Sequence, residues 1–185
     1  WLVGMVACAI DDNVQNHQLM LLHGAQGKGK STFIRHLLPP ELKDYYRNGM
    51  IIPENNNHLL QLSSCLLINL DEFDTLSPER MQNLKSLITQ DVVNERKVYD
   101  IQNYTYIRRA SFIASTNNPH CMPDVKENRR ILFSTLLNID YHTPVNHEGI
   151  YAQAYALYRQ GFQYWYENEE ITFLNNRNEA FRQKD

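Results

Sequence analysis

The sequence predicts a three-layer α/β fold, in which helices cover both faces of a central and mostly parallel sheet. Two features of the apolar pattern predict it. Short apolar runs of three to five residues alternate with longer stretches in which apolar residues recur at helical spacing. The short runs are continuously apolar, which is typical of strands that are covered on both faces. We therefore expect one α/β domain over residues 1–185.

Length, charge and cysteine content bound the class of protein. A chain of 185 residues can bury a core that needs neither metals nor disulfides. The formal net charge of −3 excludes a protein that coats nucleic acid through phosphate contacts alone, because such a protein carries a large positive charge. A local basic surface remains compatible with this charge. The three cysteines are far apart and form no CxxC pair. We expect a cytoplasmic protein with no disulfide framework and no structural metal.

The first residues predict a helix. The chain begins at Trp1 rather than at a methionine, so we expect it to be a fragment of a larger protein. Its apolar start lacks a basic leader and is too short to span a membrane, which argues against a targeting segment. We expect an N-terminal helix within residues 1–15, packed on the domain through the face formed by Leu2, Met5, Val6, Ala9 and Ile10.

The first half of the chain predicts two strands. Residues 19–22 form a buried strand, followed by a glycine-rich turn and a helix over residues 32–38 that the two prolines at 39–40 end. The polar residues 41–58 predict a helix and a loop. Residues 66–70 are apolar enough for a central strand.

The second half continues the alternation. Ser77 is a plausible N-cap, with Pro78 at the first position of a helix that buries Met81, Leu84, Leu87 and Ile88. Residues 97–107 alternate between apolar and polar and predict an exposed β-hairpin, inserted before strands at 111–115 and 131–133.

The C-terminal segment, residues 147–185, is predicted to be helical. Six residues form a stripe at helical spacing: Tyr151, Ala154, Tyr155, Tyr158, Phe162 and Trp165. Such a stripe indicates core or a subunit interface rather than a ligand site.

The strongest functional motif is the phosphate-loop pattern GxxxxGK followed by Ser or Thr, which residues 24–31 satisfy between a predicted strand and a predicted helix. Glycines let backbone N–H groups turn toward a phosphate, Lys30 would reach the β- and γ-phosphates, and the Ser31 hydroxyl would ligate Mg²⁺. The alternative is a glycine-rich turn that binds nothing, which the complete motif in its context disfavours. The predicted nucleotide-binding residues are Gly24, Ala25, Gln26, Gly27, Lys28, Gly29, Lys30, Ser31 and Thr32.

An acidic pair follows the second strand. Asp71 would hold Mg²⁺, and Glu72 would polarise the attacking water as general base. Alone, such a pair would mark a solvated strand end, but about forty residues after a phosphate loop it predicts a hydrolytic pair. Asp74 continues the acidic run without a role that we can assign.

Two further polar elements extend this pattern. The strand at 111–115 leads to Asn117, which can meet the γ-phosphate and orient the water. Arg129 and Arg130 precede the last strand, where one of them could act as a finger on a neighbouring subunit's nucleotide. Separately, these residues would be a turn asparagine and a solvated basic pair; their order favours catalytic roles.

The motifs together resemble the virulence-associated E family. The resemblance rests on four segments in this order: Gly24–Ser31, Leu67–Glu72, Arg108–Asn117 and Asn128–Arg130. Two departures, Ala114 where the family has glycine and Ile131 where an aromatic is frequent, remove no catalytic group.

Membership in that family implies an AAA+-type P-loop ATPase related to superfamily 3 helicases, found in primase–helicases of phages, plasmids and mobile elements. The resemblance implies ATP and Mg²⁺ as cofactors, a homo-oligomeric and hexameric ring, and single-stranded DNA in the ring channel. It also implies that the hairpin projects into that channel.

The hairpin carries residues suited to nucleic acid. Basic side chains track phosphates and aromatic rings stack on bases, so we expect DNA contacts from Arg96, Lys97, Tyr99, Tyr104 and Arg108. The alternative is an ordinary exposed hairpin with cross-strand tyrosine pairs.

The expected function is therefore the ATP-hydrolysing motor of a DNA helicase or primase–helicase. A regulatory AAA+-type ATPase that remodels protein rather than DNA is the first alternative. A small-molecule kinase is the second, which the acidic pair and the finger candidates disfavour, because kinases close a lid over an acceptor within one chain.

Overall fold

A five-stranded parallel sheet forms the centre of the molecule. The computed structural model describes every residue except 53–54, 71–72, 96–101, 103, 123–128 and 183–185. The strand order is β2-β3-β6-β1-β7, and every neighbouring pair is parallel. The strands are β1 (Leu19–His23), β2 (Tyr46–Asn48), β3 (Leu67–Leu70), β6 (Ser111–Thr116) and β7 (Ile131–Thr135). The predicted α/β class with a mostly parallel sheet is confirmed.

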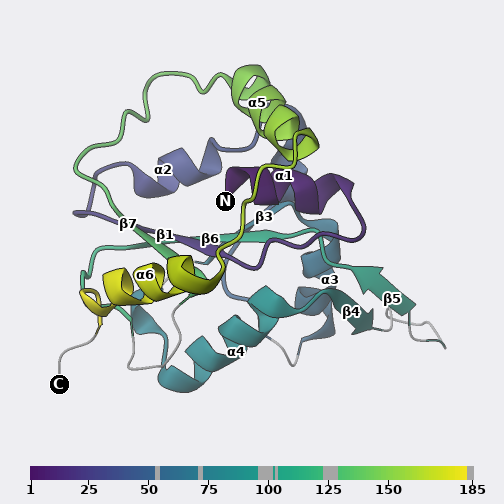
Figure 1. Ribbon diagram of the computed structural model, residues 1–185, viewed down its shortest axis with the longest axis horizontal. Helices are drawn as coiled ribbons and strands as arrows, with labels where there is room; N and C mark the ends of the chain where they lie inside the picture. Colours follow the sequence, from purple (N-terminus) through teal and green to yellow (C-terminus); the bar gives the residue numbers. More distant parts are fainter. Residues whose placement is uncertain (53–54, 71–72, 96–101, 103, 123–128, 183–185) are drawn as a thin grey trace.

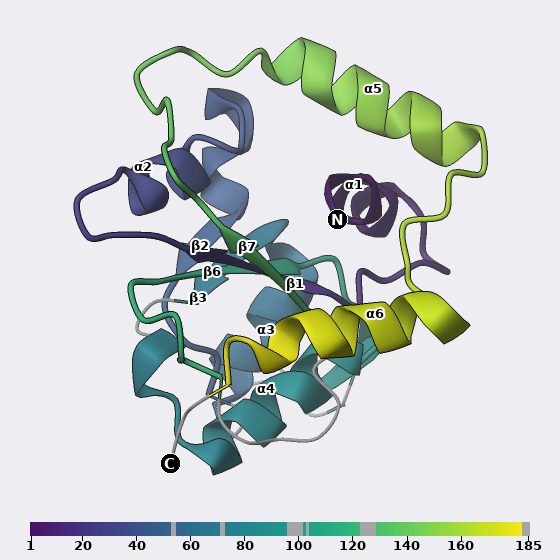
Figure 2. The same cartoon turned by 60° about the vertical axis from the view of Figure 1, so that its left-hand side comes forward.

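Helices cover both faces of the sheet, which gives three layers (Figure 1; Figure 2). One face carries α1 (Leu2–Ile10), α2 (Lys30–Arg35) and α5 (His147–Arg159). The other face carries α3 (Asn56–Ser64), α4 (Pro78–Thr89) and α6 (Asn168–Glu179). Two short 3₁₀ helices, η1 (Pro40–Tyr45) and η2 (Phe73–Thr75), join these elements. No helix in the described part of the chain is long and apolar enough to cross a bilayer.

The central strands β1 and β6 are mostly apolar because successive side chains enter two different cores. In β6, Phe112 packs in the core beneath α3 and α4, whereas Ile113 packs on the opposite face with Met5 of α1 and Ile34 of α2. Leu21 and Leu22 of β1 divide between the same two cores. Alternation along a strand thus explains why the predicted apolar runs are continuous.

Helix α1 is buried on more than the predicted face. Val3 and Val6 contact Ala154 of α5, and Met5 points into the sheet-side core. Ile10, which was expected on the packed face, is 54% exposed. The helix lies between the sheet and α5, so most of its circumference is covered. The predicted amphipathic helix, with one packed face, therefore underestimates its burial.

Residues 41–58 contain more structure than the sequence predicts. The segment holds η1, the edge strand β2 and the start of α3. The Asn55 side chain caps α3 by accepting hydrogen bonds from the Asn57 and His58 amides. The predicted cap of α4 is confirmed, since the Ser77 hydroxyl accepts from the Arg80 amide at 3.3 Å.

The predicted hairpin is present, and its first strand begins earlier than predicted. Its antiparallel strands are β4 (Val92–Glu95) and β5 (Tyr104–Ile107). The expected DNA-contact residues Arg96, Lys97 and Tyr99 lie outside the described residues.

The C-terminal aromatic stripe is not one continuous helix. Helix α5 ends at Arg159, and Gly161 adopts a left-handed φ of 77° directly afterwards. Tyr155, Phe162 and Trp165 are 47%, 50% and 47% exposed, so they are not core residues of this chain. Ala154 is buried against α1.

Candidate functional site

The loop between β1 and α2 has the backbone that its glycines permit. Gly27 and Gly29 have φ values of 76° and 81°, a region that residues with a Cβ rarely adopt. Helix α2 begins directly afterwards at Lys30, with Gly29 as its N-cap. The predicted strand–turn–helix context of the motif is therefore present.

Lys30 lies at the centre of this loop. Its side chain is buried, and its ammonium group donates to Gly24 O at 2.6 Å, Ala25 O at 2.9 Å and Asn117 Oδ1 at 2.6 Å. These three bonds use all three ammonium hydrogens. Burial lowers the pKa of Lys30, and the nearby carboxylate of Asp74 opposes that shift.

The sheet order explains why Asn117 meets Lys30. Strand β6 pairs with β1 in a register that sets Thr116 beside His23, and the Gly24 amide donates to Thr116 O at 3.2 Å. Asn117 follows directly, so parallel pairing brings it to the loop that follows β1. Of the predicted catalytic residues, Lys30 and Asn117 are thus brought together.

Asp74 has a structural position that the sequence did not assign. The Thr116 hydroxyl donates to its carboxylate, and the Asn117 amide donates to the same group at 3.4 Å. Asp74 thereby fixes the end of β6, where Asn117 stands, to the 3₁₀ helix η2. The only available signal was its place as the third acid after a buried strand.

The predicted acidic pair, Asp71 and Glu72, lies outside the described residues. Strand β3 ends at Leu70, which is in register with Ala114 of β6, so its carboxyl end is at the same edge of the sheet as the glycine loop. In the described part of the chain, no group of three His, Cys, Asp or Glu side chains could hold a metal ion. The roles of Asp71 and Glu72 remain predictions.

A cleft of about 460 Å³ opens at this edge of the sheet. Residues 26–32 of the loop and α2, residues 115–117 of β6 and its following turn, and Tyr141 line it. Gly24 and Ala25 do not line the cleft but hold Lys30 through their carbonyl oxygens. Ser31 is among the lining residues, and its hydroxyl is a hard oxygen donor of the kind that Mg²⁺ prefers.

Arg129 and Arg130 lie at the amino ends of the strands, on the side of the sheet opposite to the glycine loop. They precede β7, and Arg130 O accepts a hydrogen bond from the Leu19 amide at 2.7 Å, at the start of β1. Both line a second cavity of about 550 Å³, together with His17 and Trp165. The structure does not bring the arginine pair to the glycine-loop cleft of the same chain.

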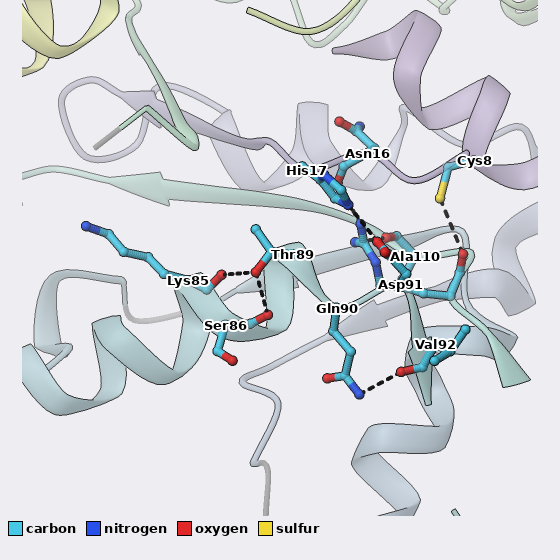
Figure 3. A network of polar contacts seen from close by, with 11 residues as sticks. Cys8, Asn16, His17, Lys85, Ser86, Thr89, Gln90, Asp91, Val92 and Ala110 are labelled. Carbon is cyan, nitrogen blue, oxygen red and sulfur yellow. Dashed lines mark hydrogen bonds and ion pairs between the residues drawn. The ribbon is translucent and has the colours of Figure 1, made fainter. Parts of the chain in front are cut away.

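Arg108 is a core residue, and the prediction that it contacts DNA is wrong. Its side chain is fully buried, and it donates to Ala110 O at 2.8 Å and Asn16 O at 2.9 Å. Figure 3 shows Asn16 and Ala110 in one polar network with the pair of His17 and Asp91. Burial lowers the pKa of Arg108. Each of its two terminal nitrogens donates to one protein carbonyl, whereas its Nε is buried without a hydrogen-bond partner.

Tyr104 is the DNA candidate that the structure leaves accessible. It lies on β5, is 43% exposed and has the Tyr106 ring at a centroid distance of 6.3 Å. Both tyrosines lie on β5, so they do not form a cross-strand pair, and the position of Tyr104 is compatible with base stacking and with an ordinary exposed hairpin.

These features define an α/β domain with a parallel sheet flanked by helices, in which a glycine loop and a buried lysine lie at the carboxyl ends of the strands. Within that class, residues 1–183 match the family model described as virulence-associated protein E-like domain, and the chain belongs to this family. The resemblance noted from the sequence motifs is thereby confirmed. No curated protein matches the chain significantly in sequence.

Solved structures share the fold. Two apo structures of the C-terminal region of NrS-1 match with TM-scores of 0.51 and 0.55, at 16% and 15% identity. The matches cover 97% and 95% of this chain but 37% and 46% of the NrS-1 chains. The chain thus spans less than half the length of these structures.

Proposed function

We propose that this chain is the ATP-hydrolysing motor domain of a DNA helicase or primase–helicase that acts in the replication of a phage, plasmid or mobile element. One observation carries the proposal: the lysine of a phosphate-loop motif is hydrogen-bonded to the asparagine at the end of the adjacent strand. A cation and an amide that meet in one cleft are suited to a terminal phosphate and its attacking water.

The glycine loop would bind the nucleotide phosphates. The left-handed φ values at Gly27 and Gly29 let successive amides turn to one side, which is how a backbone cradles an anion. On binding, Lys30 would exchange its bonds to Gly24 O and Ala25 O for phosphate oxygens. Its attraction to phosphate is stronger than its bonds to neutral carbonyls, because both partners are then charged.

The hydrolytic groups would gather beside the loop. Ser31 lines the cleft, and Asp71 follows β3 in the sequence; these two residues would hold Mg²⁺, which neutralises charge on the phosphates when bound. Glu72 would take a proton from the attacking water, and Asn117 would orient that water. Asp74 positions Asn117 through the Asn117 amide and Thr116.

The strand order supports a P-loop ATPase of the AAA+ type. Strand β6 lies between β1, which carries the glycine loop, and β3, which precedes the acidic pair. This arrangement sets Asn117 between the glycine loop and the carboxyl end of β3, which the acidic pair follows in the sequence. The separation of Arg129 and Arg130 from the same chain's cleft supports a finger that acts on the next subunit of a ring.

The DNA channel would receive the hairpin β4–β5. Tyr104 is exposed there, and Arg96, Lys97 and Tyr99 lie between the two arms in sequence. Arg108 is removed from this set, so the expected channel contacts are fewer than the sequence alone predicts.

The test is ATP hydrolysis by the protein that contains this chain, with and without single-stranded DNA. We expect hydrolysis that DNA stimulates and that Lys30→Ala abolishes, because the phosphates lose their cation. Lys43→Ala, an exposed lysine of η1, serves as the matched control and should hydrolyse ATP normally. Hydrolysis that ignores DNA would favour the protein-remodelling alternative, and Lys30→Ala with unchanged turnover would overturn the phosphate-loop assignment.

A further inference from the structure

We propose that Tyr141 is the residue that binds the base of the nucleotide, by stacking its ring on the base at the mouth of the glycine-loop cleft. The proposal rests on the proposed function, because it assigns the part of the ligand that the phosphate loop does not hold. The residue belongs to no recognised motif of the sequence, and its position in the fold alone identifies it.

Tyr141 is built into the wall of the cleft. Its half-buried side chain lines the cleft with residues 26–32 and Asn117. The ring packs directly on the backbone of Gly29, since a Cβ added there would overlap three of its carbon atoms. The aromatic ring and the phosphate loop therefore touch, and a ligand held by the loop would meet the ring.

The segment that carries Tyr141 is held in place by its own hydrogen bonds. Asp140 accepts from the amides of His142 and Thr143, both at 3.1 Å, and from the Thr143 hydroxyl at 2.6 Å. Hydrogen bonds from Thr143 and His142 lower the pKa of Asp140, so the carboxylate that closes this turn is charged at neutral pH. A turn of this kind fixes the backbone on either side of the tyrosine.

The start of this segment is also anchored to the loop. The Leu136 amide donates to His23 O at 2.8 Å, and a Cβ at Gly24 would lie 3.1 Å from Leu136 O. The chain that leads from β7 to Tyr141 therefore passes beside the first glycine of the motif.

The sheet order indicates how a nucleotide would be oriented across the glycine loop. Asn117 and the carboxyl end of β3 lie on the β6 side of the loop, so the terminal phosphate belongs on that side. Strand β7 flanks β1 on the other side, and Tyr141 follows β7. A nucleotide with its terminal phosphate toward Asn117 extends its sugar and base toward Tyr141.

The chemistry of the ring fits a base. A tyrosine ring stacks on any nucleobase, and such stacking contributes about 1–3 kcal/mol per base when measured by alanine substitution. The neighbouring ring of His142 lies 4.2 Å from it, centroid to centroid, at 36°. Tyr141 is the aromatic residue among those that line the cleft, whereas the lining on the phosphate side is polar.

The experiment separates base from phosphate binding by calorimetric titration of this chain with Mg·ATP and with Mg·tripolyphosphate, which lacks the base and sugar. Tyr141→Ala should lower ATP affinity about tenfold and leave tripolyphosphate affinity within about twofold. Tyr141→Phe, which keeps the ring, should bind both as the wild type does. Tyr155→Ala, an exposed tyrosine of α5, is the matched control and should change neither affinity.

The outcomes distinguish the two proposals. Tripolyphosphate binding that depends on Lys30 supports the phosphate loop whatever Tyr141 does. Unchanged ATP affinity in Tyr141→Ala, or an equal loss for both ligands, would overturn the role of the ring in base binding. If the wild type binds neither ligand, the proposed function fails and the role of Tyr141 fails with it. Circular dichroism of each variant checks that the fold is retained.

Discussion

Lys30 and Arg108 are two buried cations that are stabilised in the same way. Each directs its hydrogen bonds at neutral oxygens: Lys30 at two carbonyls and an amide, Arg108 at two carbonyls. These hydrogen bonds compensate part of the cost of removing a charge from water. The difference lies in location, since Lys30 borders a cleft that a ligand can enter, whereas Arg108 is enclosed between α1, the loop at Asn16 and β6.

Arg108→Ala is expected to destabilise the fold rather than to weaken DNA binding directly. The change leaves the carbonyls of Asn16 and Ala110 buried without their donor, at a cost of about 3 kcal/mol. Urea unfolding followed by circular dichroism measures it. Arg177→Ala, at an exposed position on α6, is the control and should alter stability by less than about 0.5 kcal/mol. An Arg108→Ala protein of normal stability with lost DNA affinity would restore the surface role.

Among the helices and strands, sequence patterns predict correctly those whose formation depends on residues close together in the sequence. Four of the five strands and the capped helix α4 follow from apolar runs and from the Ser77–Pro78 start. Strand β2 is missed because Tyr46–Asn48 is a short, polar edge whose strand state comes from pairing with β3. The stripe that continues to Trp165 is interrupted at Gly161, which a periodic pattern of side chains does not register.

The same distinction holds for the candidate site. The glycine loop and Lys30 could be identified from one continuous motif, and Asn117 from the order of motifs. Arg108 was misassigned because its place at the base of a hairpin suggests exposure, whereas its burial depends on Asn16, 92 residues away in the sequence. Tyr141 and Asp74 could not be found, because their relation to the loop exists only after the sheet has formed.

Gly29→Ala should destabilise the glycine loop through two separable effects. A left-handed φ costs a residue with a Cβ about 1–2 kcal/mol, and the added methyl group would also overlap the Tyr141 ring. Gly161→Ala is the matched control, because its φ of 77° is similar but nothing lies within 4 Å of its added Cβ. Urea unfolding should show a larger loss for Gly29→Ala, and Tyr141→Ala should remove most of the difference. Equal losses in the two glycine variants would show that the ring contact contributes nothing.

At the scale of the whole molecule, the sheet separates the two groups of residues that hydrolysis is expected to need. The glycine loop follows β1, and the arginine pair precedes β7 at the opposite edge. Strand β1 has five residues and therefore spans about 16 Å. In the part of the chain that the structure describes, neither arginine is paired with a carboxylate. A head-to-tail ring would bring one subunit's arginines to the next subunit's loop.

Mixing two inactive variants tests this shared site. Alanine at whichever of Arg129 and Arg130 is the finger should spare nucleotide binding and abolish hydrolysis. Adding Lys30→Ala subunits should restore part of the activity, because intact fingers then face intact phosphate loops. The measurement is ATPase activity across a titration of the two variants at concentrations that support assembly, with each variant alone as control. Full activity in a dilute, demonstrably monomeric sample would contradict the ring.

The hydrogen bond between the Leu19 amide and Arg130 O has a mechanical consequence for such a ring. Strand β1 begins at this bond and ends where the glycine loop begins, so one stiff segment connects the arginine pair to the subunit's own phosphate loop. A displacement of the arginines by the neighbour's nucleotide would act on the start of β1 through this bond. The nucleotide state of one subunit would then affect the phosphate loop of the next subunit. Such coupling would be a physical basis for sequential hydrolysis around the ring.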